Sequence, residues 1–557
     1  MNRTLIVAVI LLAHSGAAQQ PVAPAQSQQA GRASIAGRVT AADTGKPVKG
    51  VTLRLLSWEV MRRPRYATSD GQGRFEFGSL VGGQYLLEAR HDRYLTTNFG
   101  QVLSPDPARP IDLGDAERFD RADIALIRPG AIEGRVVDEF GDGAPNITVQ
   151  AYRIEYAAGA RRLMPAGGRT PIRPTDDRGH FRIFGLAPDS YYLCALSGAF
   201  TASNEAGGFA PTYFPGTTDI SRAQAVAVAA GRDASGIAIP LVPVPMASVS
   251  GILVDPAGRH LARATVFLIV RDHTGVSPLV ARMATGADGG FSFRNVPAGA
   301  YTIQAFGPPP PGAGGGLGQA PFGYLSVATS GADLDGLRVI VRPGTTMRGR
   351  VVFEGDDVAR PRPDEVRVFP RPVGFESAPI IGGGPPRSTI DEKWDFEVRD
   401  QSGWRIVRVD VQSTAWSLAR VAINGVDVTD TPVDFRSADV DGVEVVLTSR
   451  GASVTGSVKT DAGHLVRECA VVVFAADRER WMFPSRFVAM ARPNQDGVFS
   501  VHGLPPEGYL AIAVPSVKGF EWQDPEFLER ARVEAMPLVL MEGERRALDL
   551  TLTASTR

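Results

Sequence analysis

Cysteine, lysine and histidine are scarce in this chain of 557 residues, which has only two cysteines, five lysines and seven histidines. Two cysteines cannot build the dense disulfide framework of a small secreted scaffold. Cys194 and Cys469 lie far apart in apolar stretches, so we expect two buried free thiols. The histidines are scattered, and neither His-Glu-x-x-His nor Cys-x-x-Cys occurs. The sequence therefore predicts no metal site, no cofactor and no catalytic residues.

A charge bias and a long internal apolar run are also missing. The formal net charge is −1, which gives no bulk attraction to nucleic acid or to an anionic membrane. After the N-terminus no apolar stretch approaches the ~20 residues of a spanning helix. Arg3 and the apolar run Leu5 to Ala13, followed by small residues, are typical of a secretory signal peptide. We therefore expect an exported protein that is periplasmic, secreted or on the outer surface.

Glycine and proline are abundant instead, with 61 and 42 residues, and they separate short runs of alternating polarity. This pattern is typical of β-strands joined by turns. The runs also repeat: a strand with a central glycine is followed by Asp-x-x-Gly-x-Phe-x-Phe, a turn and an aromatic residue. The opening glycines are Gly37, Gly134, Gly251, Gly349 and Gly456. Internal repetition of this kind fixes the architecture before any single motif does.

The repeat length of roughly 100 residues suits one β-sandwich per copy. We therefore predict an all-β protein of five tandem Greek-key sandwiches of immunoglobulin-like or transthyretin-like type. The fourth copy departs most from the repeat, with Trp394, Phe396 and Val398 in place of the usual motif and Trp404 as its closing aromatic residue. The expected boundaries are a signal peptide at 1–18, a flexible lead at 19–32, and sandwiches at 33–128, 129–245, 246–343, 344–449 and 450–557.

The repeated motif resembles the carboxypeptidase regulatory-like domain. In the first copy the matching residues are Thr68, Asp70, Gly73, Phe75, Phe77, Leu80, Gly83 and Tyr85, and the second, third and fifth copies match similarly. The resemblance implies a seven-stranded sandwich without catalytic residues, related to carbohydrate-binding-like folds. It does not specify an activity, because fold does not determine function.

Short junctions between the copies predict a semi-rigid arrangement. The segment Ala125 to Gly130 leads almost directly into the second copy, and Val339 to Gly344 leads into the fourth. Linkers this short leave little freedom for swivelling. We expect an extended, monomeric rod of five beads.

Aromatic and arginine residues concentrate in two insertions of the fifth copy. Four aromatic residues there are candidates for contact with a ligand or partner: Trp481, Phe483, Phe520 and Trp522. Tryptophan and arginine are favoured at interfaces, and exposed aromatic rings stack on sugars. The alternative is that these side chains pack beneath their own loops.

The hairpin aspartates allow a weak calcium site, with Asp176 and Asp177 as the best pair. Calcium requires six to eight oxygen ligands, whereas each turn offers one or two carboxylates. An Asx-turn that stabilises the hairpin is the simpler interpretation.

Two functions remain open from the sequence. The first is a non-enzymatic structural or adhesive scaffold at the cell envelope, with an envelope protein as partner. The second is a carbohydrate-binding accessory protein that captures polysaccharide. Neither interpretation involves nucleic acid.

Overall fold

The structure is a computed structural model that describes residues 31–57, 64–101, 108–157, 159–166, 173–197, 208–270, 279–308, 320–355, 358–374 and 388–553. The predicted signal peptide and almost all of the predicted lead lie outside these ranges. β-strands dominate, which confirms the all-β prediction. Every helix in the described ranges is too short and too polar to span a lipid bilayer.

We infer five modules from the way the strands group. Module 1 contains β1 (Ala33–Ala41), β2 (Thr52–Ser57), β3 (Arg65–Thr68), β4 (Arg74–Leu80), β5 (Gly83–Arg90), β6 (Thr97–Asn98), β7 (Ile111–Leu113), β8 (Arg118–Phe119) and β9 (Ile124–Leu126). Module 2 contains β10 (Gly130–Val137), β11 (Ile147–Ala157), β12 (Ala160–Pro165), β13 (His180–Leu186), β14 (Asp189–Ser197), β15 (Gly208–Phe209), β16 (Thr212–Tyr213), η2 (Ile220–Arg222), β17 (Ala225–Val228), β18 (Asp233–Pro240) and β19 (Pro243–Val244). Module 3 contains β20 (Met246–Val254), β21 (Thr265–Val270), β22 (Leu279–Ala284), β23 (Gly290–Pro297), β24 (Gly299–Phe306), β25 (Phe322–Thr329) and β26 (Leu334–Ile340).

The last two modules complete the chain. Module 4 contains β27 (Thr345–Glu354), η4 (Pro363–Glu365), β28 (Val366–Pro372), β29 (Thr389–Ile390), β30 (Asp395–Gln401), β31 (Trp404–Val411), β32 (Ser417–Ile423), β33 (Val426–Asp427), β34 (Val433–Asp434) and β35 (Val440–Thr448). Module 5 contains β36 (Ala452–Lys459), β37 (Ala470–Ala475), η5 (Arg478–Trp481), β38 (Val488–Ala491), β39 (Val498–Leu504), β40 (Glu507–Val514), η6 (Glu521–Gln523), α1 (Pro525–Arg532), β41 (Met536–Leu540), β42 (Arg545–Ala547) and β43 (Leu550–Thr551).

Each module encloses a hydrophobic cluster between two sheets. In one sheet the first strand lies between an antiparallel hairpin strand and a parallel closing strand, as β10 lies between β13 and β18. Alternating side chains of both sheets point into the cluster, because successive residues of a strand face opposite sides. Module 4 differs, since β32 joins β35 in a six-stranded sheet with the hairpin strands.

Each module needs a glycine in its first strand because a larger side chain would not fit there. At Gly134 an added Cβ would lie 2.2 Å from the carbonyl oxygen of Ile237 on the parallel closing strand. Gly37, Gly251, Gly349 and Gly456 meet closing-strand or loop carbonyls in the same way, at 2.4, 2.2, 1.9 and 1.7 Å. In modules 2, 3 and 4 the parallel register shifts at this glycine. Close approach of two backbones at a bulge therefore requires glycine.

The tyrosine that ends the motif closes a corner of its sandwich. The hydroxyl of Tyr191 donates a hydrogen bond of 2.7 Å to the carbonyl oxygen of Ala187, four residues earlier. The same bond recurs in modules 1, 3 and 5, through Tyr85, Tyr301 and Tyr509. Burial of a hydroxyl requires such a partner, so this bond fixes the turn beneath it.

Module 4 lacks this corner. The sequence interpretation placed Trp404 at the tyrosine position, but its side chain is 42% exposed and lies under the guanidinium of Arg436. The tyrosines stand five residues after the partner of the first-strand residue that precedes the register shift, as Tyr191 follows Leu186. Gln401 is that residue in module 4, so buried Ile406 occupies the tyrosine position. Isoleucine keeps the packing and loses the hydrogen bond.

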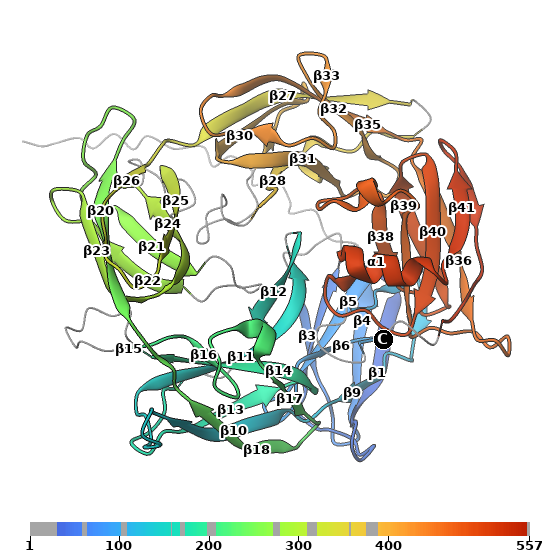
Figure 1. Cartoon of the computed structure of the whole chain (residues 1–557). Helices are drawn as coiled ribbons and strands as arrows, with labels where there is room; N and C mark the ends of the chain where they lie inside the picture. The colour runs from blue at the N-terminus through green and yellow to red at the C-terminus, as the bar shows by residue number, and fades with distance from the viewer. Residues whose placement is uncertain are drawn as a thin grey trace, which may run out of the picture.

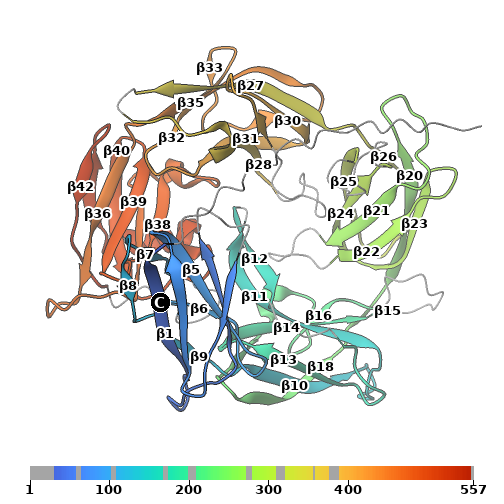
Figure 2. The same cartoon turned by 180° about the vertical axis from the view of Figure 1, so that it is seen from behind.

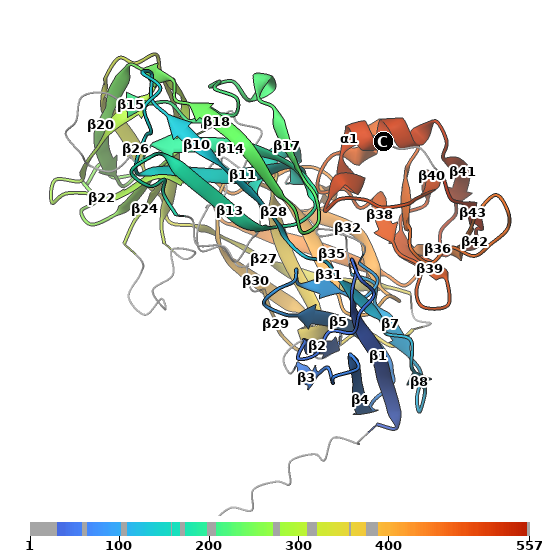
Figure 3. The ribbon, with the colours of Figure 1, turned by 90° about the horizontal axis from the view of Figure 1, so that it is seen from below.

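The modules do not form the extended rod that the short junctions suggested. Figure 1 shows them arranged around a closed ring, with module 5 beside module 1, and Figure 2 shows the same closure from behind. Figure 3 shows that the ring is not flat, because module 1 lies to one side of the others. Hydrogen bonds join Asp112 of module 1 to Asn494 and Gln495 of module 5. The rod prediction is wrong because a short junction fixes an angle between neighbours without making that angle straight.

Candidate interaction surfaces

The first candidate surface is residues 477–487, which we call the docking segment. Asp477 begins it by accepting a hydrogen bond of 3.0 Å from the amide of Glu479, which caps η5. Trp481 is 2% exposed, and its indole nitrogen donates to the carbonyl oxygen of Ala475 over 2.7 Å. Its ring meets Phe474 edge to face. Trp481 therefore packs beneath its own segment and presents no face to a ligand.

The middle of the docking segment contacts module 4. Arg408 of β31 donates through Nη2 to the carbonyl oxygen of Pro484 over 2.6 Å, and the guanidinium of Arg371 lies over the Phe483 ring. Arg486 pairs with Asp430 at 3.1 Å and donates to two backbone carbonyls of β32. Burial lowers the pKa of Arg408 to about 10, although Asp430 partly offsets this effect. These contacts seal the boundary between modules 4 and 5.

Module 5 also contacts module 2. Arg161 of β12 pairs through Nε with Asp524 at 2.6 Å and through Nη1 with Glu526 at 2.5 Å. Asp524 also caps α1 by accepting from the amide of Glu526. Lys518 adds an ion pair of 2.8 Å with Asp189. No sequence pattern predicts these pairs, because their members lie more than 300 residues apart.

The remaining predicted contact residues have different surroundings. Phe520 is 57% exposed, just before η6. Trp522 is half-buried and packs against the core of module 5. Phe483 is half-buried, and a Cβ built on Gly159 of module 2 would lie 3.5 Å from its Cβ. Of the four predicted aromatic residues, Phe520 alone presents a largely free side chain.

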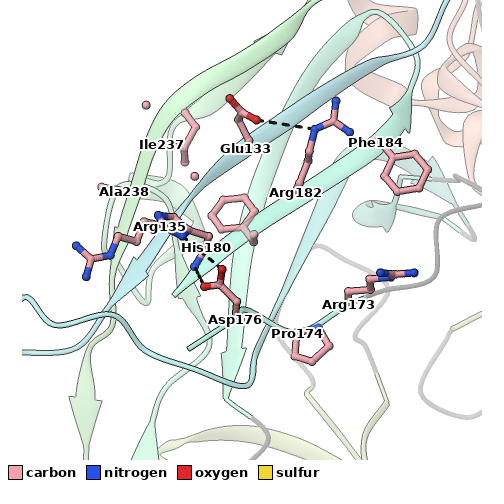
Figure 4. A pocket seen from close by; sticks show the side chains of 13 residues that line it. Glu133, Arg135, Arg173, Pro174, Asp176, His180, Arg182, Phe184, Ile237 and Ala238 are labelled. Carbon is pink, nitrogen blue, oxygen red and sulfur yellow. Dashed lines mark hydrogen bonds and ion pairs between the residues drawn. The ribbon is translucent and has the colours of Figure 1, made fainter. Parts of the chain in front are cut away.

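The second candidate surface is an open hollow of about 880 Å³ on the outer face of the sheet β13–β10–β18 in module 2 (Figure 4). Phe184, nearly half-exposed, and Arg173 stand at one side of it. Arg182 lies 3.8 Å from Glu133 and 2.7 Å from Asp233. The hollow thus combines one aromatic face with paired charges, which suits a polar ligand more than an apolar one.

Module 4 has a corresponding hollow of about 720 Å³ around Gly349. Its outer-face pair is Arg348 with Glu397 at 3.5 Å. Arg348 precedes the opening glycine as Glu133 does in module 2, and Glu397 pairs with it across the hairpin as Arg182 pairs with Glu133. The two modules therefore carry the same ion pair with its charges exchanged.

Asp176 serves the hairpin turn beside the module 2 hollow. Its Oδ1 accepts from the amides of Arg178 and His180 at 3.0 and 2.7 Å. These bonds, led by that of His180, hold the pKa of Asp176 below its ordinary value. Asp70, Asp391 and Asn494 accept the same two bonds in modules 1, 4 and 5. The turn acceptor is thus the residue five before the phenylalanine, and an asparagine fulfils the role in module 5.

A calcium site at Asp176 and Asp177 gains no support from these contacts. One oxygen of Asp176 is occupied by amides, and Oδ2 lies 3.4 Å from Nδ1 of His180. Within the described ranges, no group of three or more histidine, cysteine or acidic side chains is placed to hold a metal ion. Cys194 and Cys469 are both free and buried, as expected, and burial raises their thiol pKa values to about 12 and about 11.

The comparisons with known proteins agree with the repeat. Two segments, residues 34–114 and 248–309, match the carboxypeptidase regulatory-like domain family. These segments lie in modules 1 and 3, so the resemblance read from the motif is confirmed there. No curated protein matches the chain.

Solved structures with some similarity include bacterial pilins. One is GBS52, the minor pilin of Streptococcus agalactiae, with 16% identity and a TM-score of 0.24 over 38% of this chain and 96% of that one. A streptococcal ancillary pilin has 10% identity and a TM-score of 0.18 over 56% and 99%. The Bacillus anthracis TIE protein has 9% identity and a TM-score of 0.13 over 91% and 68%. Scores this low carry no conclusion about this chain.

Proposed function

We propose that this protein is a non-catalytic scaffold, exported to the cell envelope, in which β-sandwich modules form a structural or adhesive unit. The observation that carries the proposal is the use of the docking segment within the chain. Its arginine Arg486 and the backbone of Pro484 bind module 4, while Trp481 fills the core of module 5. The polar and aromatic groups of this segment thus hold modules 4 and 5 in position relative to each other.

The polar residues of the repeat support the same role. Asp176 caps a hairpin, Tyr191 closes a corner and Arg182 is shared between two carboxylates. Each polar group is engaged by its own module, whereas catalysis relies on positioned groups that can reach a substrate. A scaffold needs rigid modules and defined angles between them, and these contacts supply both.

Fractionation of the envelope tests this proposal. The full-length chain, expressed in its own cells, should be recovered with the envelope or outside the cell after removal of residues 1–18, as N-terminal sequencing and intact mass would report. Purified mature protein should then co-sediment with isolated envelopes. Recovery of the unprocessed chain from the cytoplasm, or no association with envelopes, would overturn the proposal.

Carbohydrate binding is a second candidate because of the hollow in module 2. Phe184 offers an exposed aromatic face beside hydrogen-bonding side chains, a combination that polar ligands such as sugars use. A glycan array with the wild-type chain and Phe184→Ala tests it, and Phe520→Ala tests the other exposed ring. Retention that neither substitution weakens would exclude both surfaces.

A further inference from the structure

The smaller sheet of module 4, β28–β31–β34, has one face that points away from the module core. Val368 of β28 and Val407 of β31 belong to the core cluster. Because successive residues of a strand face opposite sides, Phe369, Arg371 and Trp404 lie on the other face. We call these three residues the arginine–aromatic face. In the view of Figure 1, β28 and β31 lie on the side of module 4 towards the middle of the ring.

Trp404 presents part of its indole to solvent, and a neighbouring ion pair holds the ring in place. The guanidinium carbon of Arg436 lies 4.9 Å from the centroid of the Trp404 ring. Asp434, which pairs with Trp404 across β34 and β31, accepts two hydrogen bonds from Arg436, at 2.9 Å from Nε and 2.8 Å from Nη2. A bidentate pair of this kind fixes the cation. The indole is therefore held in one orientation while the rest of its surface stays accessible.

Arg371 is an exposed cation that lies between two aromatic rings. Its guanidinium carbon is 5.6 Å from the centroid of Phe369 and 5.8 Å from that of Phe483 in module 5. Its side chain forms no ion pair and no hydrogen bond with the residues that the structure describes. A guanidinium that stacks on aromatic rings keeps its in-plane N–H groups available for a planar oxyanion.

The other arginines on this side of the sheet each have a carboxylate beside them. Arg408 has Asp430 at 3.0 Å, Arg436 has Asp434 at 2.8 Å, and Arg367 has Asp410 opposite it across β28 and β31. Within the described ranges, Arg371 is thus the arginine of this face that lacks a carboxylate. Complementary charge across a contact steers the encounter and fixes the register of the partner, so a ligand with a negative group is favoured at Arg371.

The open edge of β28 does not favour the addition of a peptide strand. β28 is the outer strand of its sheet, and the amide of Val373, just after it, donates to the carbonyl oxygen of Trp404 over 3.0 Å. Because bonding alternates along an antiparallel strand, Pro370 and Pro372 face the open edge, where they offer no amide hydrogen. The amide of Val368 on the same edge already donates to a side-chain hydroxyl. A ligand is therefore recognised by side chains rather than by strand pairing.

We propose that the arginine–aromatic face binds a carboxylated sugar of an acidic polysaccharide. Arg371 pairs with the residue two positions after Trp404, so the two are diagonal neighbours about 7–8 Å apart on one face. A sugar ring that packs on the indole can therefore direct its carboxylate to the guanidinium, whose planar donors match both carboxylate oxygens. The site is separate from the hollow of module 2, and the inference does not depend on the proposed scaffold role.

Binding of polygalacturonate to the full mature chain tests the site, with the methyl-esterified polymer as the neutral reference. Biolayer interferometry at constant ionic strength should show saturable binding of the acid form, roughly tenfold tighter than that of the ester. Equal binding of the two polymers, or binding of neither, would overturn the proposal. Polyglutamate is the probe for an acidic peptide, and binding of polyglutamate as tight as that of polygalacturonate would overturn the assignment to a sugar.

Variants locate the binding. Arg371→Gln and Trp404→Ala should each weaken the binding of polygalacturonate roughly fivefold or more, and circular dichroism should show that both exposed-site variants are folded. Arg259→Gln removes an exposed arginine of module 3 that pairs with Asp255 at 2.7 Å, and this matched control should bind as the wild type does. Undiminished binding by both test variants would overturn the proposal. Binding that is lost in Phe184→Ala and kept in Trp404→Ala would also overturn it, because the sugar would then occupy the hollow of module 2.

Discussion

Arg161 and Asp524, which lie 363 residues apart in sequence, form an ion pair with 2.6 Å between Nε and Oδ2. The side chain of Asp524 is almost wholly buried, while that of Arg161 is partly exposed. Glu526 adds a second carboxylate to the same guanidinium. Arg161 of module 2 thus binds two carboxylates at the N-terminal end of α1 in module 5, and these ion pairs help to hold the ring closed.

Arg161→Gln should loosen the contact between modules 2 and 5. Loss of the cation leaves a buried carboxylate without its partner, which costs about 1–3 kcal/mol. Amide hydrogen exchange in α1 should become faster, and the radius of gyration from solution scattering should increase. Arg182→Gln, which removes an exposed pair within module 2, is the matched control and should change neither quantity. Equal exchange in α1 for both variants would contradict this role.

Trp481→Ala and Phe520→Ala should differ sharply. The first creates a cavity in the core of module 5 and should cost about 3–5 kcal/mol. The second removes an exposed ring and should change stability by less than about 0.5 kcal/mol. Urea denaturation followed by fluorescence and circular dichroism measures both. If Trp481→Ala retains less ligand, the loss should be proportional to the fraction of the protein that is unfolded. A fully folded Trp481→Ala protein that fails to bind would indicate a direct contact between Trp481 and the ligand.

Gly37→Ala should strongly destabilise module 1. The new Cβ would lie 2.4 Å from the carbonyl oxygen of Ala122, and overpacking of this kind costs about 1–3 kcal/mol or more. Gly78→Ala is the control, because a Cβ there meets nothing within 4 Å. Thermal unfolding should separate the two variants by several degrees. A Gly37→Ala protein as stable as Gly78→Ala would show that the closing strand can move away.

Asp176 should make module 2 sensitive to acid. Its folded pKa is lower than its ordinary value of 3.8, so the stability it contributes is present above that value and is lost as the pH falls through the folded pKa. Asp176→Asn keeps the oxygen acceptor without the titration, as Asn494 does in module 5. Between about pH 5 and about pH 2.5 the unfolding temperature should fall less in this variant. If the unfolding temperatures of the wild type and Asp176→Asn fall in parallel as the pH is lowered, Asp176 does not contribute to the acid sensitivity.

The sequence predicted the interior of the modules well because the repeated residues make their contacts within one module. Each opening glycine, hairpin acceptor and corner tyrosine makes its contact within its own module, and such contacts leave a pattern at fixed spacing. Where the motif decayed, in module 4, the spacing still located the hairpin, since Phe396 pairs with Gly349 as Phe181 pairs with Gly134. The closing aromatic residue was misplaced because Trp404 lies only two residues before the true position, which Ile406 occupies.

The arrangement of the modules could not be predicted in the same way. The contacts that close the ring join side chains such as Lys518 and Asp189, which occur once and follow no period. The arginines and aromatic residues of the docking segment suggested an interface, and in the structure this segment contacts module 4. Composition does not tell whether such a segment contacts another molecule or another module. Trp481 illustrates the ambiguity, since a tryptophan signals burial as readily as contact.

The exchanged ion pair of modules 2 and 4 bears on how the chain avoids folding errors. Tandem sandwiches with similar hairpins risk pairing a strand of one module with the hairpin of another. If β13 paired with β27, Arg182 would face Arg348, and if β30 paired with β10, Glu397 would face Glu133. Like charges directly opposite each other in a sheet are destabilising. The exchanged charges therefore favour the pairing of each hairpin strand with the first strand of its own module.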